Sequence, residues 1–99
     1  MKRNTKTPLE EFKYALDLWF KAGFEWRLNG RHLYLKDCTE NVPTKLMIAI
    51  DTVDFGFACY DDDTNEAYMI TEKEHKLVDR TIRALKKLYK EVENHNDCI

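Results

Sequence analysis

Apolar residues recur at helical spacing near both ends of the chain. Leu9, Phe12, Leu16 and Trp19 lie three or four residues apart, which predicts a helix near residues 8–22 with one wide apolar face. A second helix is predicted over residues 72–93 on the same grounds. Its apolar side holds Leu77, Val78, Ile82, Leu85, Leu88, Tyr89 and Val92.

Both predicted helices begin with a capping box, in which a Thr and a Glu three residues later bond each other's main chain. Thr7 and Glu10 form the first box, and Pro8 stands at the first helical position, where proline is favoured. Thr71 and Glu74 form the second box. The sequence therefore predicts both helix starts independently of the apolar spacing.

Between the helices, apolar and polar residues alternate as they do in half-buried strands. The pair Asn29-Gly30 is preferred in two-residue hairpin turns. A turn there pairs Leu28 with Arg31 and Trp26 with Leu33. On this register one face carries Phe24, Trp26, Leu28, Leu33 and Leu35, and the other carries Glu25, Arg27, His32 and Tyr34.

Three further strands are predicted, over residues 45–50, 55–60 and 66–70. A turn between the first two of these pairs Ile50 with Phe55 and keeps both apolar sets on one face. The register of the fifth strand stays open. Either Ala67 and Met69 or Tyr68 and Ile70 face the core.

This order of elements, α-β-β-β-β-β-α, predicts an α+β domain. We expect an antiparallel sheet of four to five strands, with the N-terminal and C-terminal helices packed on one of its faces. The domain should span residues 7–94, between a polar leader (1–6) and a flexible C-terminal tail (95–99). The expected core consists of Phe12, Leu16, Trp19, Trp26, Leu33, Ile48, Phe57, Ile82 and Leu85.

The composition agrees with a small cytoplasmic protein. The chain has 99 residues, of which 43% are hydrophobic, which is typical of a single folded domain. It contains neither an apolar run of about 20 residues that could cross a bilayer nor the apolar stretch of a signal peptide. Cys38, Cys59 and Cys98 are an odd number of cysteines without close spacing, which favours reduced thiols.

Charge is distributed unevenly along the chain, although the net charge is only −2. Residues 37–70 contain one basic residue and eight acids, whereas residues 1–36 contain eight Lys or Arg and four acids. Such asymmetry bears on binding partners and not on the fold. The acids that we single out are Asp51, Asp54, Asp61, Asp62, Asp63 and Glu66.

No catalytic or metal-binding motif is evident, so we expect no enzyme, no metal site and no cofactor. The chain has no Ser and only three Gly, and its histidines (His32, His75 and His95) lack the close pairing of zinc ligands. Residues 61–72 resemble a calcium-binding EF-hand loop at its first, third, fifth and twelfth positions. Glu66 replaces the required glycine at the sixth position, so we favour an acidic turn, with weak calcium binding left open.

The last predicted helix carries a basic stripe opposite its apolar face, formed by Lys73, Lys76, Arg80, Arg83, Lys87 and Lys90. This stripe predicts either a solvated helix surface or contact with nucleic-acid phosphates. The order helix, sheet, helix resembles that of a double-stranded-RNA-binding domain, which has a basic start to its second helix. The corresponding segment here, residues 71–76, includes two glutamates. We expect the eight acids of residues 37–70 to weaken nucleic-acid binding by repelling phosphates. Nucleic-acid binding is therefore our alternative function and not the preferred one.

The sheet face turned away from the helices is predicted to bind a protein partner. It should display Tyr34, Met47 and Tyr60, together with small residues, where a solvated face normally carries charge. A second copy of the chain or the loop at 37–44 could equally cover it. Our predicted partner-binding residues are Tyr34, Met47, Tyr60, Asp61, Asp62, Asp63 and Tyr68.

The most specific hypothesis is a non-enzymatic inhibitor. Acids along residues 51–66 can imitate a run of phosphates and so occupy the nucleic-acid channel of a basic enzyme. In size, composition and absence of motifs, the chain resembles small accessory proteins of phages and mobile elements. That resemblance implies inhibition of a host or defence enzyme.

Overall fold

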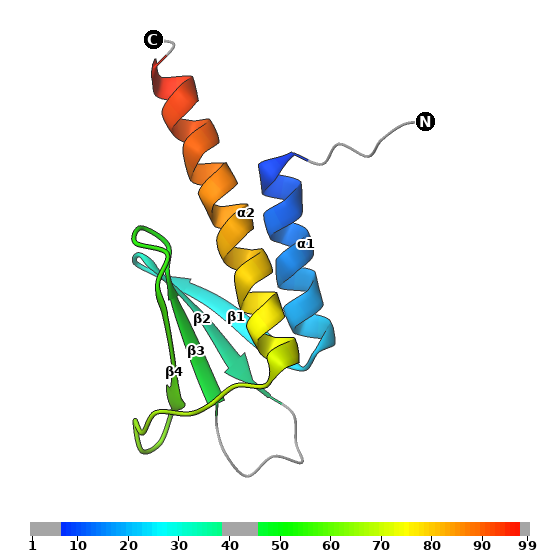
Figure 1. Ribbon diagram of the computed structural model, residues 1–99, viewed down its shortest axis with the longest axis vertical. Helices are drawn as coiled ribbons and strands as arrows, with labels where there is room; N and C mark the ends of the chain where they lie inside the picture. The colour runs from blue at the N-terminus through cyan, green and yellow to red at the C-terminus, as the bar shows by residue number, and fades with distance from the viewer. Residues whose placement is uncertain (1–6, 39–45, 98–99) are drawn as a thin grey trace.

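The computed structural model describes residues 7–38 and 46–97 and contains two helices and one sheet (Figure 1). The elements follow the order α1 (Pro8–Lys21), β1 (Phe24–Asn29), β2 (His32–Asp37), β3 (Leu46–Asp51), β4 (Phe57–Asp61) and α2 (Glu72–Asp97). The four strands form an antiparallel sheet in the order β1-β2-β3-β4. The predicted α+β class is therefore confirmed.

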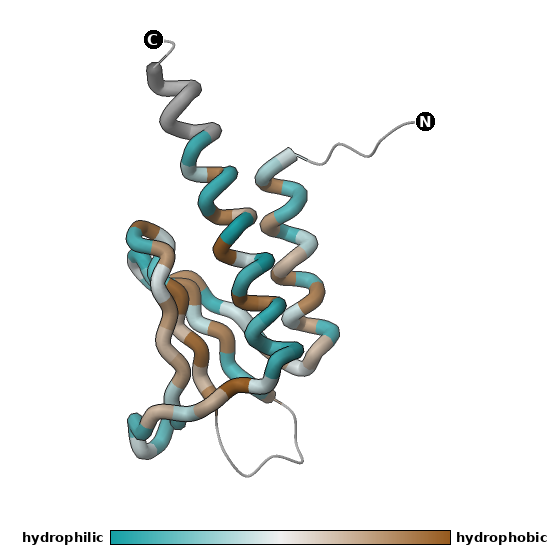
Figure 2. Tube along the Cα trace, viewed as in Figure 1, coloured by the Kyte–Doolittle hydropathy of each residue, from teal (hydrophilic) through white to brown (hydrophobic). Residues whose placement is uncertain are grey.

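One core joins both helices to the sheet. Helix α1 supplies Phe12, Leu16 and Trp19, and α2 supplies Val78, Ala84 and Leu85. The strands supply alternate residues, so that one face of the sheet is buried: Phe24, Leu33, Leu35, Leu46, Ile48 and Ile50. The helices lie side by side and run in opposite directions (Figure 1). Hydrophobic and hydrophilic residues follow one another in bands along both helices (Figure 2).

Both predicted capping boxes are present. The Thr7 hydroxyl accepts a hydrogen bond from the Glu10 amide at 3.1 Å, and the Glu10 carboxylate accepts one from the Thr7 amide at 3.0 Å. Thr71 and Glu74 make the same two bonds, at 3.2 and 2.9 Å. Helix α2 extends to Asp97, beyond the expected end at residue 93. The leader 1–6 and residues 98–99 lie outside the described residues.

The register predicted for the first hairpin is wrong by two residues. Leu28 pairs with Leu33 and not with Arg31, because Gly30 and Arg31 are the two central turn residues. Gly30 has a φ of 64° and Arg31 has no positive φ, which is the glycine-first arrangement of a type II′ turn. Since a shift of two residues preserves side-chain parity, the predicted faces are nevertheless correct.

The β3–β4 connection is also two residues longer than predicted. Ile50 pairs with Phe57, whereas we expected Phe55. Phe55 lies in the turn with a φ of 65°, a left-handed conformation that aromatic residues seldom adopt. Its ring packs against Tyr89 of α2, with the ring centroids 6.0 Å apart. The turn is thus held by a tertiary contact that alternation cannot reveal.

The fifth strand predicted over residues 66–70 is not formed. Ala67 makes a single bridge with Tyr60, and the Tyr68 amide donates to the Cys59 carbonyl at 3.0 Å. Beyond this point Ile70 packs against the core, whereas the Met69 side chain is 89% exposed. The segment crosses from the edge of β4 to the start of α2.

Two of the predicted core residues are not buried. Trp26 and Phe57 lie on the helix side of the sheet but are 46% and 39% exposed. Both belong to edge strands, β1 and β4. The helices bury the middle of this face and leave its margins accessible. Ile82, also predicted as core, is half-buried against the cluster.

Candidate functional site on the open sheet face

One face of the sheet is covered by neither α1 nor α2 (Figure 1). The alternate strand residues that do not point to the core point to this open face, which comprises Glu25, Arg27, Asn29, His32, Tyr34, Lys36, Met47, Ala49, Asp51, Ala58 and Tyr60. Residues 39–45, part of the loop that we considered as a cover, lie outside the described residues.

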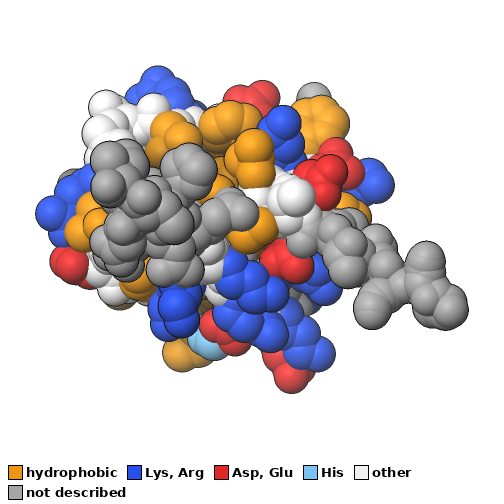
Figure 3. Space-filling view, turned by 90° about the horizontal axis from the view of Figure 1, so that it is seen from above, with side chains coloured by type: hydrophobic (Ala, Val, Ile, Leu, Met, Phe, Trp, Pro, Cys, Tyr) orange, Lys and Arg blue, Asp and Glu red, His pale blue; other side chains and the backbone are white. Residues whose placement is uncertain are grey.

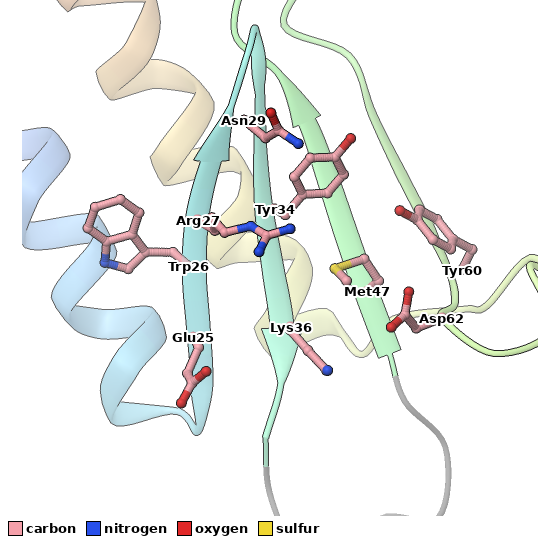
Figure 4. A pocket seen from close by; sticks show the side chains of 9 residues that line it. All are labelled: Glu25, Trp26, Arg27, Asn29, Tyr34, Lys36, Met47, Tyr60 and Asp62. Atoms are coloured by element: carbon pink, nitrogen blue, oxygen red, sulfur yellow. The ribbon is translucent and has the colours of Figure 1, made fainter.

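A pocket of about 530 Å³ is hollowed into this face. Tyr34 on β2, Met47 on β3 and Tyr60 on β4 lie next to one another across three strands (Figure 4). Met47 is directly paired with Tyr60 and with Lys36, and all three floor side chains are half-buried. The floor of the pocket is therefore apolar and aromatic.

Charged side chains of both signs surround this floor. Arg27 and Lys36 stand on the β1–β2 side, and Asp62 stands beside Tyr60 on the opposite side (Figure 4). Glu25 and Asn29 complete the lining along β1. An apolar centre with a charged rim is the usual anatomy of a protein-binding surface.

Trp26 borders the pocket along β1, but its indole points away from it, toward α1 (Figure 4). On that side it lines a shallower groove of about 280 Å³ with Phe20, Leu16 and two charged residues of α1. The two surfaces meet at the β1 edge and use opposite faces of the sheet.

Tyr60 is a neutral hydrogen-bonding group at physiological pH. Burial raises the pKa of its hydroxyl, and the nearby Tyr34 and Asp62 raise it further, since each disfavours a second negative charge. The hydroxyl therefore stays protonated and can donate a hydrogen bond to a ligand at the pocket wall.

The acidic turn next to the pocket is built on Asp61. Its carboxylate Oδ1 accepts hydrogen bonds from the main-chain amides of Asp63 at 2.8 Å and Thr64 at 3.2 Å. Asn65 closes the turn with a φ of 63°. Asp61 is thus folded back on its own loop, and Asp62 is the acid of this turn that lines the pocket.

The turn between β3 and β4 repeats this geometry ten residues earlier. Asp51 Oδ1 accepts from the amides of Val53 and Asp54 at 2.8 and 3.1 Å. In both turns the amide of the left-handed residue, Phe55 or Asn65, donates to the carbonyl of the first aspartate, at 2.8 and 2.7 Å. The two turns have the same hydrogen-bond pattern despite different sequences.

Arg31 neutralises the acids of the earlier turn. Its Nη2 atom lies 2.7 Å from Asp51 Oδ2 and 2.8 Å from Asp54 Oδ2. The hydrogen bonds from Arg31, followed by those from the turn amides, hold the pKa of Asp51 well below its usual range. Asp51 and Asp54 therefore lie at one end of β4, paired with Arg31, and the turn that begins with Asp61 lies at the other end.

The structure brings four of the seven predicted partner-binding residues to one pocket: Tyr34, Met47, Tyr60 and Asp62. Asp61 and Asp63 belong to the adjacent turn, and Tyr68 does not line the pocket. The charged rim on β1 and β2 was not among the predicted residues. Alternation already placed Glu25 and Arg27 on this face, so the signal for them was present in the sequence.

Five of the six predicted nucleic-acid-binding residues line two hollows between α1 and α2, on the helix side of the molecule. Lys90 is exposed on α2 but lines neither hollow.

Within the described ranges, no three His, Cys, Asp or Glu side chains are grouped as metal ligands would be. His32 lies on the open face, whereas Cys59 lies on the helix side of β4. Burial raises the pKa of the Cys59 thiol, and the neighbouring Glu74 adds to this effect. Burial and the negative charge of Glu74 both disfavour the reactive thiolate form of Cys59.

No helix within the described part of the chain is long and apolar enough to cross a membrane. Comparisons with protein-family models, with curated proteins and with solved structures found no match to this chain.

Proposed function

We propose that this protein is a non-enzymatic binding domain that recognises a segment of another protein on the open face of its sheet. The observation that carries the proposal is the row formed by Tyr34, Met47 and Tyr60 at the floor of the 530 Å³ pocket. Aromatic and Met side chains are enriched at the centres of protein interfaces, where they supply large contact area.

The size of the face favours a short segment as the occupant. Four strands about 4.8 Å apart and about 20 Å long give a surface of about 400 Å² in plan. A stable interface between two globular proteins covers about 800 Å² on each partner. The open face alone therefore suits a peptide-like segment better than a second rigid domain.

The rim supplies a preference for charge. Asp62 lies beside Tyr60, and Arg27 and Lys36 lie across the pocket. We propose a segment that places an apolar side chain between the tyrosines, a basic residue near Asp62 and an acidic residue near Arg27. Inhibition of a basic host or defence enzyme would be one use of such binding, and the Asp61–Asp63 turn would then be its acidic rim.

The test is a pull-down from nuclease-treated host-cell lysate with three forms of the tagged protein. The double variant Y34A/Y60A removes the proposed centre, and F20A removes an exposed aromatic ring (67% accessible) from the helix side. A protein that is retained by the wild type and by F20A but lost by Y34A/Y60A supports the proposal. Equal retention by all three forms contradicts it, as does a lysate from which no form retains a protein.

A further inference from the structure

The groove between α1 and α2 gathers cations from both helices. A hollow of about 400 Å³ is lined by Leu18, Lys21 and Ala22 of α1 and by Lys73, Lys76, Leu77 and Arg80 of α2. No acid lines it among the described residues. Lys21 does not belong to the basic stripe of α2 and joins it only in the fold.

A second hollow of about 220 Å³ continues the groove and shares Arg80 with the first. Arg83 and Lys87 add two further cations, and Glu11, which pairs with Lys87 at 3.2 Å, is the acid in its lining. We define the basic groove as Lys21, Lys73, Lys76, Arg80, Arg83 and Lys87. Lys and Arg side chains gather on one side of the molecule, with some acids among them, along the lower edge of Figure 3.

We propose that the basic groove binds the sugar-phosphate backbone of a nucleic acid without reading its sequence. From Lys73 to Lys87 the cations recur every three or four residues, over about 21 Å at 1.5 Å per residue. A regular row of cations of this length matches a regular row of phosphates. An acidic protein segment carries its charges less regularly and is the competing occupant.

The groove also contains an aromatic side chain, Tyr14, which suits a nucleic-acid ligand. Tyr14 lies in the second hollow, and the Arg80 guanidinium carbon is 5.5 Å from its ring centroid. Arg80 is therefore held over an aromatic ring at the point where the two hollows join. Grooves that combine cations with an aromatic ring are typical of proteins that bind single strands.

The middle acids do not oppose this binding as strongly as their number suggests. Arg31 pairs with Asp51 and Asp54 at 2.7 and 2.8 Å, which offsets part of the acidic charge. At physiological salt the Debye length is about 8 Å, so exposed acids farther than this from the groove are largely screened.

The proposal is tested by fluorescence anisotropy with labelled 20-nucleotide single-stranded DNA, single-stranded RNA and duplex DNA at 50 and 200 mM salt. If all six cations contact phosphates of a single strand, the slope of log K against log salt is about −4, and affinity falls about 250-fold over this range. A preference for single strands over the duplex, or the reverse, identifies the form that the groove accepts.

The variant K21Q/K76Q/R80Q removes three of the six groove cations and should halve that slope to about −2. Its matched control carries the same loss of charge at three cations that line neither hollow, in K13Q/K86Q/K90Q. Binding that is lost by the first variant and kept by the second supports the proposal. Circular dichroism melting shows whether each variant is folded.

Three results would overturn the proposal. The first is no binding to any probe at 50 mM salt, and the second is equal loss of binding in both triple variants, which would make net charge alone responsible. The third is displacement of the probe by poly-glutamate at equal charge concentration, which would assign the groove to an acidic protein segment. These results do not test the open sheet face, because the groove variants leave its pocket residues unchanged.

Discussion

The indole of Trp19 donates a hydrogen bond to the hydroxyl of Thr81 across the helix pair, at 2.9 Å and in the fully buried core. The same hydroxyl donates to the carbonyl of Leu77 at 2.7 Å. Thr81 therefore satisfies the polar atom of the largest core side chain, and the bond fixes how α1 is aligned along α2.

Replacing Thr81 by Val keeps the shape of the side chain but leaves the indole N–H unpaired. We expect the free energy of unfolding to fall by about 1–3 kcal/mol, the usual cost of an unsatisfied buried donor. Urea denaturation of T81V, W19F and the double variant measures the coupling. If the two single losses simply add in the double variant, the bond contributes nothing of its own.

The Arg31–Asp51 pair predicts how stability depends on pH. Because Asp51 has a lower pKa in the folded state than in the unfolded chain, its contribution is fully present above about pH 4, near the ordinary pKa of Asp. It is lost as the pH falls below that value toward the folded-state pKa. Urea midpoints at pH 6, 4 and 2.5 should therefore fall more steeply for wild type than for D51N.

The control for this measurement is D62N, which leaves the Arg31–Asp51 pair intact and should follow the wild-type profile. Parallel profiles for wild type and D51N would show that the pair does not stabilise the fold, despite its 2.7 Å contact.

Truncating an aromatic side chain to Ala should cost less stability at the half-exposed edges of the sheet than in the core. Trp19→Ala removes a fully buried side chain and should cost about 3–5 kcal/mol. Trp26→Ala and Phe57→Ala should each cost about 1–2 kcal/mol, because only about half of each side chain leaves water on folding. Chemical denaturation compares the three variants directly. A loss above 3 kcal/mol at Trp26 would contradict the exposure of the β1 edge.

These margins also show what the sequence could predict. The capping residues predicted both helix starts, and the apolar alternation predicted the correct faces of β1 and β2, because both depend on local chemistry. Both hairpin registers were wrong by two residues, since a shift of two leaves the alternation unchanged. Arg31 helps to hold the observed register through a contact 21 residues away, because its carbonyl accepts from the Thr52 amide at 2.8 Å and from the Thr52 hydroxyl at 2.6 Å.

For the candidate sites, the sequence could likewise predict which residues share a face but not how each side chain is used. Alternation identified Tyr34, Met47 and Tyr60 as neighbours on the open face, which the pocket confirms. It could not separate Asp61, which holds its own turn, from Asp62, which faces the pocket. Lys21 was missed because its place beside the basic stripe depends on how the two helices pack.

For the proposed partner, we expect the centre and the rim of the pocket to act on different rate constants. Tyr60→Ala should speed dissociation at least tenfold with little change in stability, because aromatic anchors dominate interface energy. Tyr60→Phe keeps the ring and is its control. Asp62→Lys should instead slow association, most clearly at low salt. Surface plasmon resonance separates the two effects.

In that experiment Asp61 must be left unchanged, since its replacement would open the turn and confuse the two effects. If Tyr60→Ala unfolds the domain, or if both variants bind as the wild type does, the pocket is not the docking surface.

The left-handed Phe55 couples two parts of the chain that the sheet does not join. Its ring lies against Tyr89 and under the Lys86 ammonium, 5.7 Å away, so the β3–β4 turn is fastened to the outer half of α2. Amides of the turn should therefore exchange with solvent deuterium together with those of α2 near residue 86, as one cooperative unit. The turn at residues 61–65 has the same hydrogen-bond pattern, but its left-handed residue is Asn65, which has no aromatic ring to pack against α2. Its amides should therefore exchange earlier.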